Sequence, residues 1–192
     1  MNYRSSIVLL LVCLLTSCGR ANYQLNSELP GGLNTAFQLK NYSDSQIITL
    51  GENYQVGKIF MILDKNMVGE VNLTYSNRET GDDPTVAQIQ INTKEKKIKD
   101  MRVLGDDSKL DPGELDIDSW TVDSNVAIDN ALKAGNNIKN LNYDTIICQT
   151  YNFYLGKYQV WSVQFIDSSN NKKYWAIVDP KTGEIIDNGN KN

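Results

Sequence analysis

The sequence predicts an α+β fold, built from antiparallel β-sheet units with at least one packed helix. Three observations support this fold class. Several segments alternate apolar and polar residues with the two-residue period of a half-buried strand, as Trp161, Val163 and Phe165 do. Turn-forming segments such as DPKTG at residues 179–183 separate the strands and indicate antiparallel neighbours. Residues 126–135 instead have the spacing of a helix with one apolar side.

Residues 1–17 have the features of a secretory targeting segment. Arg4 supplies a positive charge, and residues 7–15 form an apolar run that is too short to cross a bilayer comfortably. The letters LTSC at residues 15–18 resemble the bacterial lipoprotein signal, which implies that Cys18 is acylated and begins the mature chain. An ordinary signal peptide that contains a cysteine is the alternative. Several acyl chains anchor a protein stably, so we expect a cell-envelope protein, lipid-anchored to the extracytoplasmic side of a bacterial membrane.

Composition limits the classes of function. Cleavage before Cys18 would leave 192 − 17 = 175 residues and, by removing Arg4, would change the net charge from −4 to −5. The acidic balance argues against nucleic acid, whose phosphates need a basic surface. The sequence contains no histidine, which excludes histidine-based general bases and metal sites. Paired carboxylates could still hydrolyse sugars, but no pattern singles out two of them. We therefore expect no enzyme, no metal and no cofactor.

Cys148 is the one cysteine expected to remain a thiol in the mature chain. Cys13 leaves with the targeting segment and Cys18 is acylated, so an internal disulfide is excluded. Cys148 lies in the apolar run of residues 145–148, which favours a buried core residue over a reactive thiol.

The first half of the mature chain is predicted to contain a tether and a β-rich unit. Residues 18–43 are polar and contain the breaker PGG, so we expect a tether between the anchor and the fold. Residues 44–105 are expected to form a β-rich N-terminal unit. Its strands are predicted at residues 46–50, 55–63, 67–76, 86–91 and 98–104.

Residues 105–118 are acidic and contain DPG, and they have two interpretations. They could bind calcium, since carboxylates are hard oxygen ligands. Counted from Asp107, however, Lys109 and Pro112 occupy the third and sixth positions of an EF-hand loop, which require a ligand and a glycine. We therefore favour a solvated linker.

Residues 119–192 are predicted to form a second α+β unit. Asp123 or Ser124 can cap the start of its helix, and Gly135 can end it. Four strands are then expected, at residues 143–153, 158–167, 174–178 and 185–186.

This second unit resembles the PepSY family of small α+β modules in bacterial envelope proteins and protease propeptides. The resemblance rests on VAIDNAL at residues 126–132, WSVQF at 161–165 and YWAIVDPKTGE at 174–184. It covers about a third of the chain, and the motifs are mostly structural. The resemblance implies a non-catalytic module that binds a peptide or a protease and restrains a peptidase. It implies no catalytic residues.

The two halves of the chain have a common ending. Residues 85–101 read as strand, turn and strand, as do residues 174–186, so the halves could be related copies. The first half lacks an obvious counterpart of the helix at 126–134, which argues against this hypothesis.

The candidate partner-binding residues are Tyr174 and Trp175. Adjacent residues on a strand point to opposite faces, so both cannot lie in a single one-sided core. The outward residue is then either covered or exposed as a binding anchor. A peptidase inhibitor would use a strand edge, for which residues 174–186 are the candidate. The alternative is a structural or assembly lipoprotein that contacts envelope proteins or cell wall through a broad apolar patch.

Overall fold

The computed structural model describes residues 22–23, 27–79, 85–106, 112–135, 142–153 and 158–190. The predicted targeting segment and Cys18 lie outside these residues, as do residues 107–111 of the segment considered for calcium. Within them, no helix is both long and apolar enough to cross a membrane.

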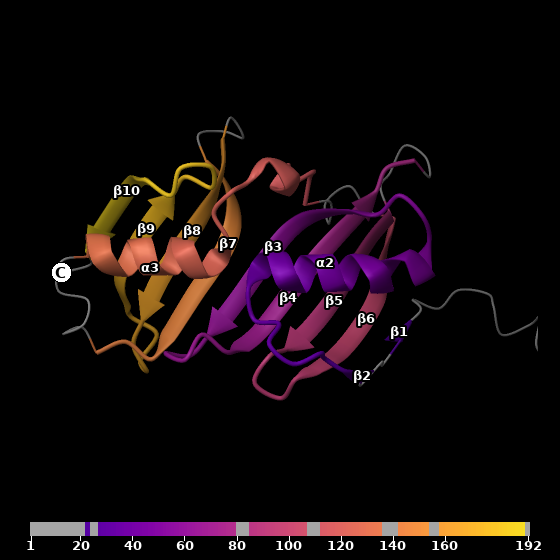
Figure 1. Ribbon diagram of the computed structural model, residues 1–192, viewed down its shortest axis with the longest axis horizontal. Coiled ribbons are helices and arrows are strands. Elements are labelled where there is room, and N and C mark those ends of the chain that lie inside the picture. The colour runs from indigo at the N-terminus through magenta and orange to yellow at the C-terminus, as the bar shows by residue number, and fades with distance from the viewer. Residues whose placement is uncertain are drawn as a thin grey trace, which may run out of the picture.

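The described residues form an α+β fold around one antiparallel sheet, as the sequence predicts (Figure 1). Nine of the ten described strands follow the order β1-β6-β5-β4-β3-β7-β8-β9-β10, and the tenth, β2, also pairs with β6. The longer strands are β3 (Gln55–Leu63), β4 (Gly69–Asn77), β5 (Thr85–Asn92), β6 (Lys97–Asp106), β7 (Thr145–Phe153), β8 (Tyr158–Ile166), β9 (Lys172–Val178) and β10 (Ile185–Asn190). The short strands β1 (Asn22–Tyr23) and β2 (Ser27–Glu28) both lie along β6.

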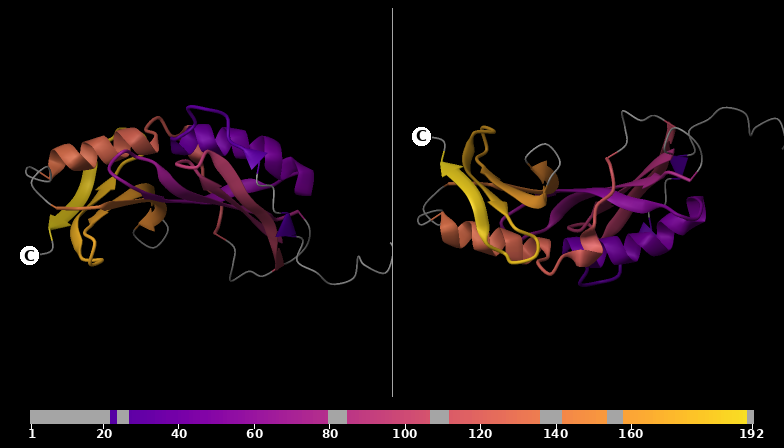
Figure 2. Two further views of the ribbon diagram at one scale, coloured as in Figure 1. Left: turned by 90° about the horizontal axis from the view of Figure 1, so that it is seen from below. Right: turned by 90° about the horizontal axis from the view of Figure 1, so that it is seen from above.

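Two α-helices, α2 (Ala36–Ile47) and α3 (Ser124–Ala134), cover the same face of this sheet (Figure 2). Each helix precedes four strands, so the order α2-β3-β4-β5-β6 is followed by α3-β7-β8-β9-β10. Two single 3-10 turns, η1 (Ile48–Leu50) and η2 (Ile117–Ser119), follow α2 and precede α3.

The two groups of strands join where β3 pairs with β7. Their antiparallel register places Met61 opposite Cys148 and Leu63 opposite Ile146. All four of these side chains are buried on the helix-covered face, in one core cluster that includes residues of both groups. The chain therefore has a single continuous core beneath the two helices.

The starts of the two helices are also joined. The Oδ1 atom of Asp123 accepts hydrogen bonds from the backbone N–H of Ser124, at 2.6 Å, and from that of Phe37, at 3.1 Å. The hydroxyl of Ser124 accepts a bond from the buried N–H of Ala36 at 2.9 Å. These side chains satisfy N–H groups that a helix start leaves unpaired. The predicted cap of α3 is therefore also a cap of α2.

The structure corrects the prediction for the first part of the chain. Residues 18–43 were expected to form a tether, but β1 and β2 pair with β6 and α2 begins at Ala36. Leu29 and Leu39 are buried, so this segment belongs to the core. The strand predicted at residues 46–50 is also wrong, because these residues end α2 and form η1. A helix therefore does precede the first group of strands.

Candidate functional site

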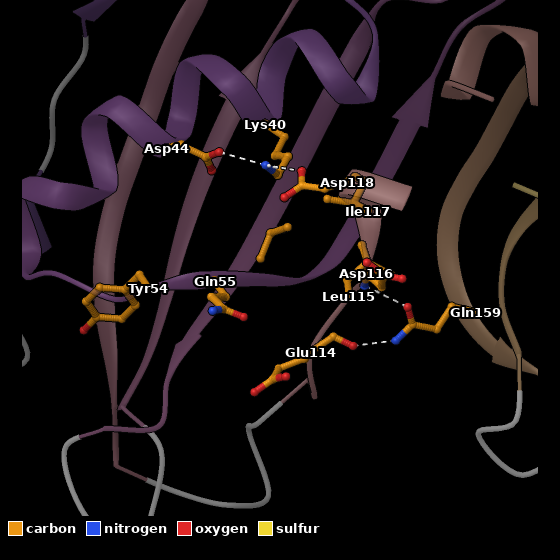
Figure 3. A pocket seen from close by; sticks show the side chains of 11 residues that line it. Lys40, Asp44, Tyr54, Gln55, Glu114, Leu115, Asp116, Ile117, Asp118 and Gln159 are labelled. Carbon is orange, nitrogen blue, oxygen red and sulfur yellow. Dashed lines mark hydrogen bonds and ion pairs between the residues drawn. The ribbon is translucent and has the colours of Figure 1, made fainter. Parts of the chain in front are cut away.

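A groove of about 640 Å³ lies on the helix-covered side, between α2, the start of β3 and the segment that leads to α3 (Figure 3). The segment passes close to β3, since a Cβ added to Gly57 would lie 2.1 Å from the carbonyl oxygen of Gly113. Glycine at position 57 therefore permits this approach. The lining residues are Lys40, Asp44, Tyr54, Gln55, Val56, Glu114, Leu115, Asp116, Ile117, Asp118 and Gln159.

The α2 side of the groove holds a charged network around Lys40 (Figure 3). Its Nζ atom lies 3.0 Å from Asp44 Oδ2 and 3.3 Å from Asp118 Oδ1. The hydroxyl of Tyr75 donates to the other oxygen of Asp44 at 3.0 Å. Burial alone would lower the pKa of Lys40, but its bonds to Asp44 and Asp118 outweigh burial and raise the pKa. Burial and the Asp44 charge raise the pKa of Tyr75 well above its ordinary value. Lys40 stays charged and Tyr75 stays neutral near pH 7, so neither is a base.

Other contacts show what the groove does for the fold. Gln159 on β8 accepts a bond from the N–H of Asp116 and donates one to the carbonyl of Glu114. The Glu114 carboxylate lies 3.6 Å from Arg78 Nε. The part of the chain that the structure describes contains no group of three acidic or cysteine side chains that could hold a metal. The contacts of the lining residues thus connect α2 and β8 to the segment that leads to α3. Most of the charged side chains in the groove are already paired.

The structure separates the two candidate binding residues. Tyr174 points to the helix-covered side, with 1% of its surface exposed and its ring 6.1 Å from that of Phe165. It lies in the core, so the prediction of a partner contact is wrong for Tyr174. Trp175 lies on the opposite face and is half-buried. A Cβ added to Gly189 would lie 2.8 Å from Trp175 Nε1, so the indole lies against β10 where that strand has no side chain.

Figure 2 shows that one face of the sheet is covered by no described helix. Trp175 belongs to a larger apolar group on this face. The strand registers align Ile62, Ile147, Gln164 and Trp175 in one row across β3, β7, β8 and β9. Phe60, Gln149, Ser162 and Ile177 form the next row. We call the apolar members of this face the uncovered-face band. They are Phe60, Ile62, Ile147, Tyr151, Val160, Trp175 and Ile177.

Burial within the uncovered-face band is uneven. Val160 and Ile177 are 1% and 5% exposed, although they lie opposite the helices and outside the main core cluster. Tyr151 and Ile62 are 51% and 39% exposed. The band thus combines a buried base with exposed apolar side chains, and such patches on soluble proteins mark surfaces that bind other molecules.

Sequence reasoning found one member of this band and missed the others. The prediction of a strand at residues 55–63 did not separate its two faces, so Phe60 and Ile62 were not considered as surface residues. The available signal was that both faces of β3 and β7 are apolar, as in the run of Ile146, Ile147 and Cys148. Strands that are apolar on both faces need cover on both faces.

Comparisons of the chain with models of known protein families, with curated proteins and with solved structures found no match.

Proposed function

We propose that this protein is a lipid-anchored component of a bacterial cell envelope that binds another protein and catalyses no reaction. The anchor is the acylated Cys18, and support for it comes from the position of LTSC directly after a short apolar run. Substitution Cys18→Ala should release the protein from the membrane fraction and abolish incorporation of labelled palmitate. If the variant stayed in the membrane fraction and still incorporated palmitate, the proposed anchor would be wrong.

The binding surface is the uncovered-face band, and this band is the observation that carries the proposal. Binding anchors are commonly aromatic side chains set in a well-packed surround. Trp175 meets this description, with Gly189 beneath its ring and Ile177 two residues along β9. The partner is a peptide or a protease, and the protein restrains a peptidase, as the resemblance of residues 119–192 to PepSY modules implies.

Exchange of single band residues tests the binding proposal. Tyr151→Asp and Trp175→Asp each place a negative charge in the band. The control Val126→Asp places the same charge on α3, where Val126 is 42% exposed. Copurification from membranes should lose the same peptidase or peptide-bearing protein in both band variants and retain it in the α3 variant. The purified protein should then reduce the activity of that peptidase. An equal set of copurifying proteins in all three variants would overturn the proposal.

The PepSY-like character of the second unit is also part of the proposal, together with descent of both units from one ancestor. Each unit has one helix followed by four antiparallel strands. The units meet through their first strands and through their helix starts. A two-fold relation between copies would produce this arrangement.

A structural or assembly role is the second candidate, and the breadth of the band favours it. The band extends over β3, β7, β8 and β9, which is wider than a groove for one peptide strand. Under this alternative, the proteins lost from the Tyr151→Asp and Trp175→Asp variants would be abundant envelope proteins or wall-bound material, and no peptidase would be inhibited.

A further inference from the structure

The two ends of the sheet differ in what covers them. At one end β6 pairs with β1 and β2, and the N–H of Leu29 donates to the carbonyl of Lys96 at 2.8 Å. At the other end β10 pairs with β9 and with no further described strand (Figure 1). An edge strand turns the N–H and C=O of alternate residues outward, where another strand can bind them. The β10 end is therefore open to strand addition.

In the middle of β10, the backbone N–H of Asn188 is bonded to the side chain of the preceding residue and not to β9. The N–H of Asn188 donates to the carboxylate of Asp187 at 2.8 Å, and both residues are exposed. Asp187 lies opposite Ile177, so its side chain is on the uncovered face beside the band. β10 also lacks the lysine and proline residues that protect many edges, although a bulge interrupts its register between Ile185 and Asp187. An added strand would meet a backbone donor and a negative charge at this point.

A cavity adjoins the start of the same strand. It has a volume of about 440 Å³, and its lining includes Trp120, Tyr158, Pro180 and Ile186. Tyr158 and Ile186 are 59% and 45% exposed, so apolar surface faces solvent here. The cavity is large enough for one or two side chains of a bound peptide. Added strands commonly gain affinity from main-chain bonds and specificity from such pockets.

We propose that β10 binds an extended peptide segment of the partner as an additional strand. One apolar side chain of that segment occupies the cavity beside Ile186, and a basic side chain pairs with Asp187. This inference rests on the proposed function and specifies how the partner binds. A second copy of this chain fits less well, because β10 contains no basic residue that could pair with Asp187 of the other copy.

The test selects peptides without assuming their sequence. Full-length protein in detergent micelles is immobilised, and a random ten-residue peptide library displayed on phage is selected on it. Enriched peptides should alternate apolar with polar residues and carry a lysine or arginine. Their affinity should fall at least tenfold for Asn188→Pro, which removes the outward donor, and for Asp187→Lys. A peptide whose basic residue is exchanged for glutamate should recover binding to Asp187→Lys.

Control variants distinguish a loss of strand addition at β10 from general damage to the fold. Asp129→Lys makes the same charge change at an exposed position on α3 and should leave peptide affinity unchanged. Bound peptide should slow hydrogen exchange at the amide of Asn188. Failure to enrich any peptide, or equal binding of enriched peptides to all variants, would overturn the inference. If the partner is lost from the Trp175→Asp variant but retained by Asn188→Pro and Asp187→Lys, the proposed function stands and strand addition is wrong.

Discussion

Substitution Ser124→Ala should weaken the whole fold, because it removes one of the two hydrogen bonds between the starts of α2 and α3. The Ser124 hydroxyl is 2.9 Å from the N–H of Ala36, and Ala36 is fully buried. A buried N–H without a partner costs about 1–3 kcal/mol. The better helix propensity of alanine returns up to roughly 0.5 kcal/mol. The free energy of unfolding should therefore fall by about 0.5–3 kcal/mol, which lowers the Tm by roughly 1–12 °C for a chain of this length.

Urea unfolding followed by tryptophan fluorescence measures this change. Trp120 and Trp161 are buried and in edge-to-face contact, with ring centroids 5.1 Å apart, so they report on the core. The neighbouring substitution Asn125→Ala alters an exposed residue and should stay within about 0.5 kcal/mol of the unaltered protein. A loss below 0.5 kcal/mol for Ser124→Ala would refute the shared cap as a stabilising contact between the two units.

Three further predictions concern single side chains. The buried hydroxyl of Tyr174 has no hydrogen-bond partner among the described residues, so Tyr174→Phe should leave the urea midpoint unchanged or raise it, and a clear loss of stability would contradict its assignment. Burial raises the pKa of the Cys148 thiol, so Ellman's reagent at pH 8 should modify Cys148 only after unfolding; rapid modification of the native protein would count against a core position. Bonds from Lys173 and from the backbone and side chain of Asn171 lower the pKa of Asp167 below its unfolded value, so this carboxylate stabilises the fold above pH 4 and progressively less as pH falls. Asp167→Asn should therefore lower the Tm at pH 7 and by less at pH 3, and an equal difference at both pH values would disprove the link.

Local patterns were sufficient to predict the eight longer strands, β3 to β10, but not the short strands β1 and β2. β3 begins and ends at the predicted residues, 55 and 63, and α3 begins beside the Asp123 cap and ends at Ala134, before Gly135. These features depend on neighbours in the sequence, namely side-chain alternation, turn residues and helix caps.

The helix α2 was missed because its buried side is only weakly apolar. Its buried residues are Ala36, Leu39, Ser43 and Ile47, so two of four are small and one is polar. The helix is stabilised by packing on the sheet more than by its own sequence pattern. The spacing of Thr35 and Gln38, which form a capping box, was the one local signal for its start.

The candidate site depends on contacts between distant segments, which local patterns do not specify. Alternation shows that Trp175 and Tyr174 face opposite sides, but not which side the helices cover. That side is set by the packing of α3 on β8 and β9. The extent of the uncovered-face band depends on the pairing of β3 with β7, whose residues Ile62 and Ile147 are 85 positions apart, 147 − 62 = 85. The same pairing brings Ile62 and Ile147 into one row with Trp175.

Photo-crosslinking from position 175 in living cells tests the central claim that the uncovered face binds a partner. In one variant a photoreactive residue replaces Trp175. In the control variant the same residue replaces Asp129, which is exposed on α3. The account predicts that position 175 captures one peptidase or peptide-bearing protein in good yield, whereas position 129 does not. Crosslinks from position 175 that stay within the protein, or equal capture from both positions, would contradict it.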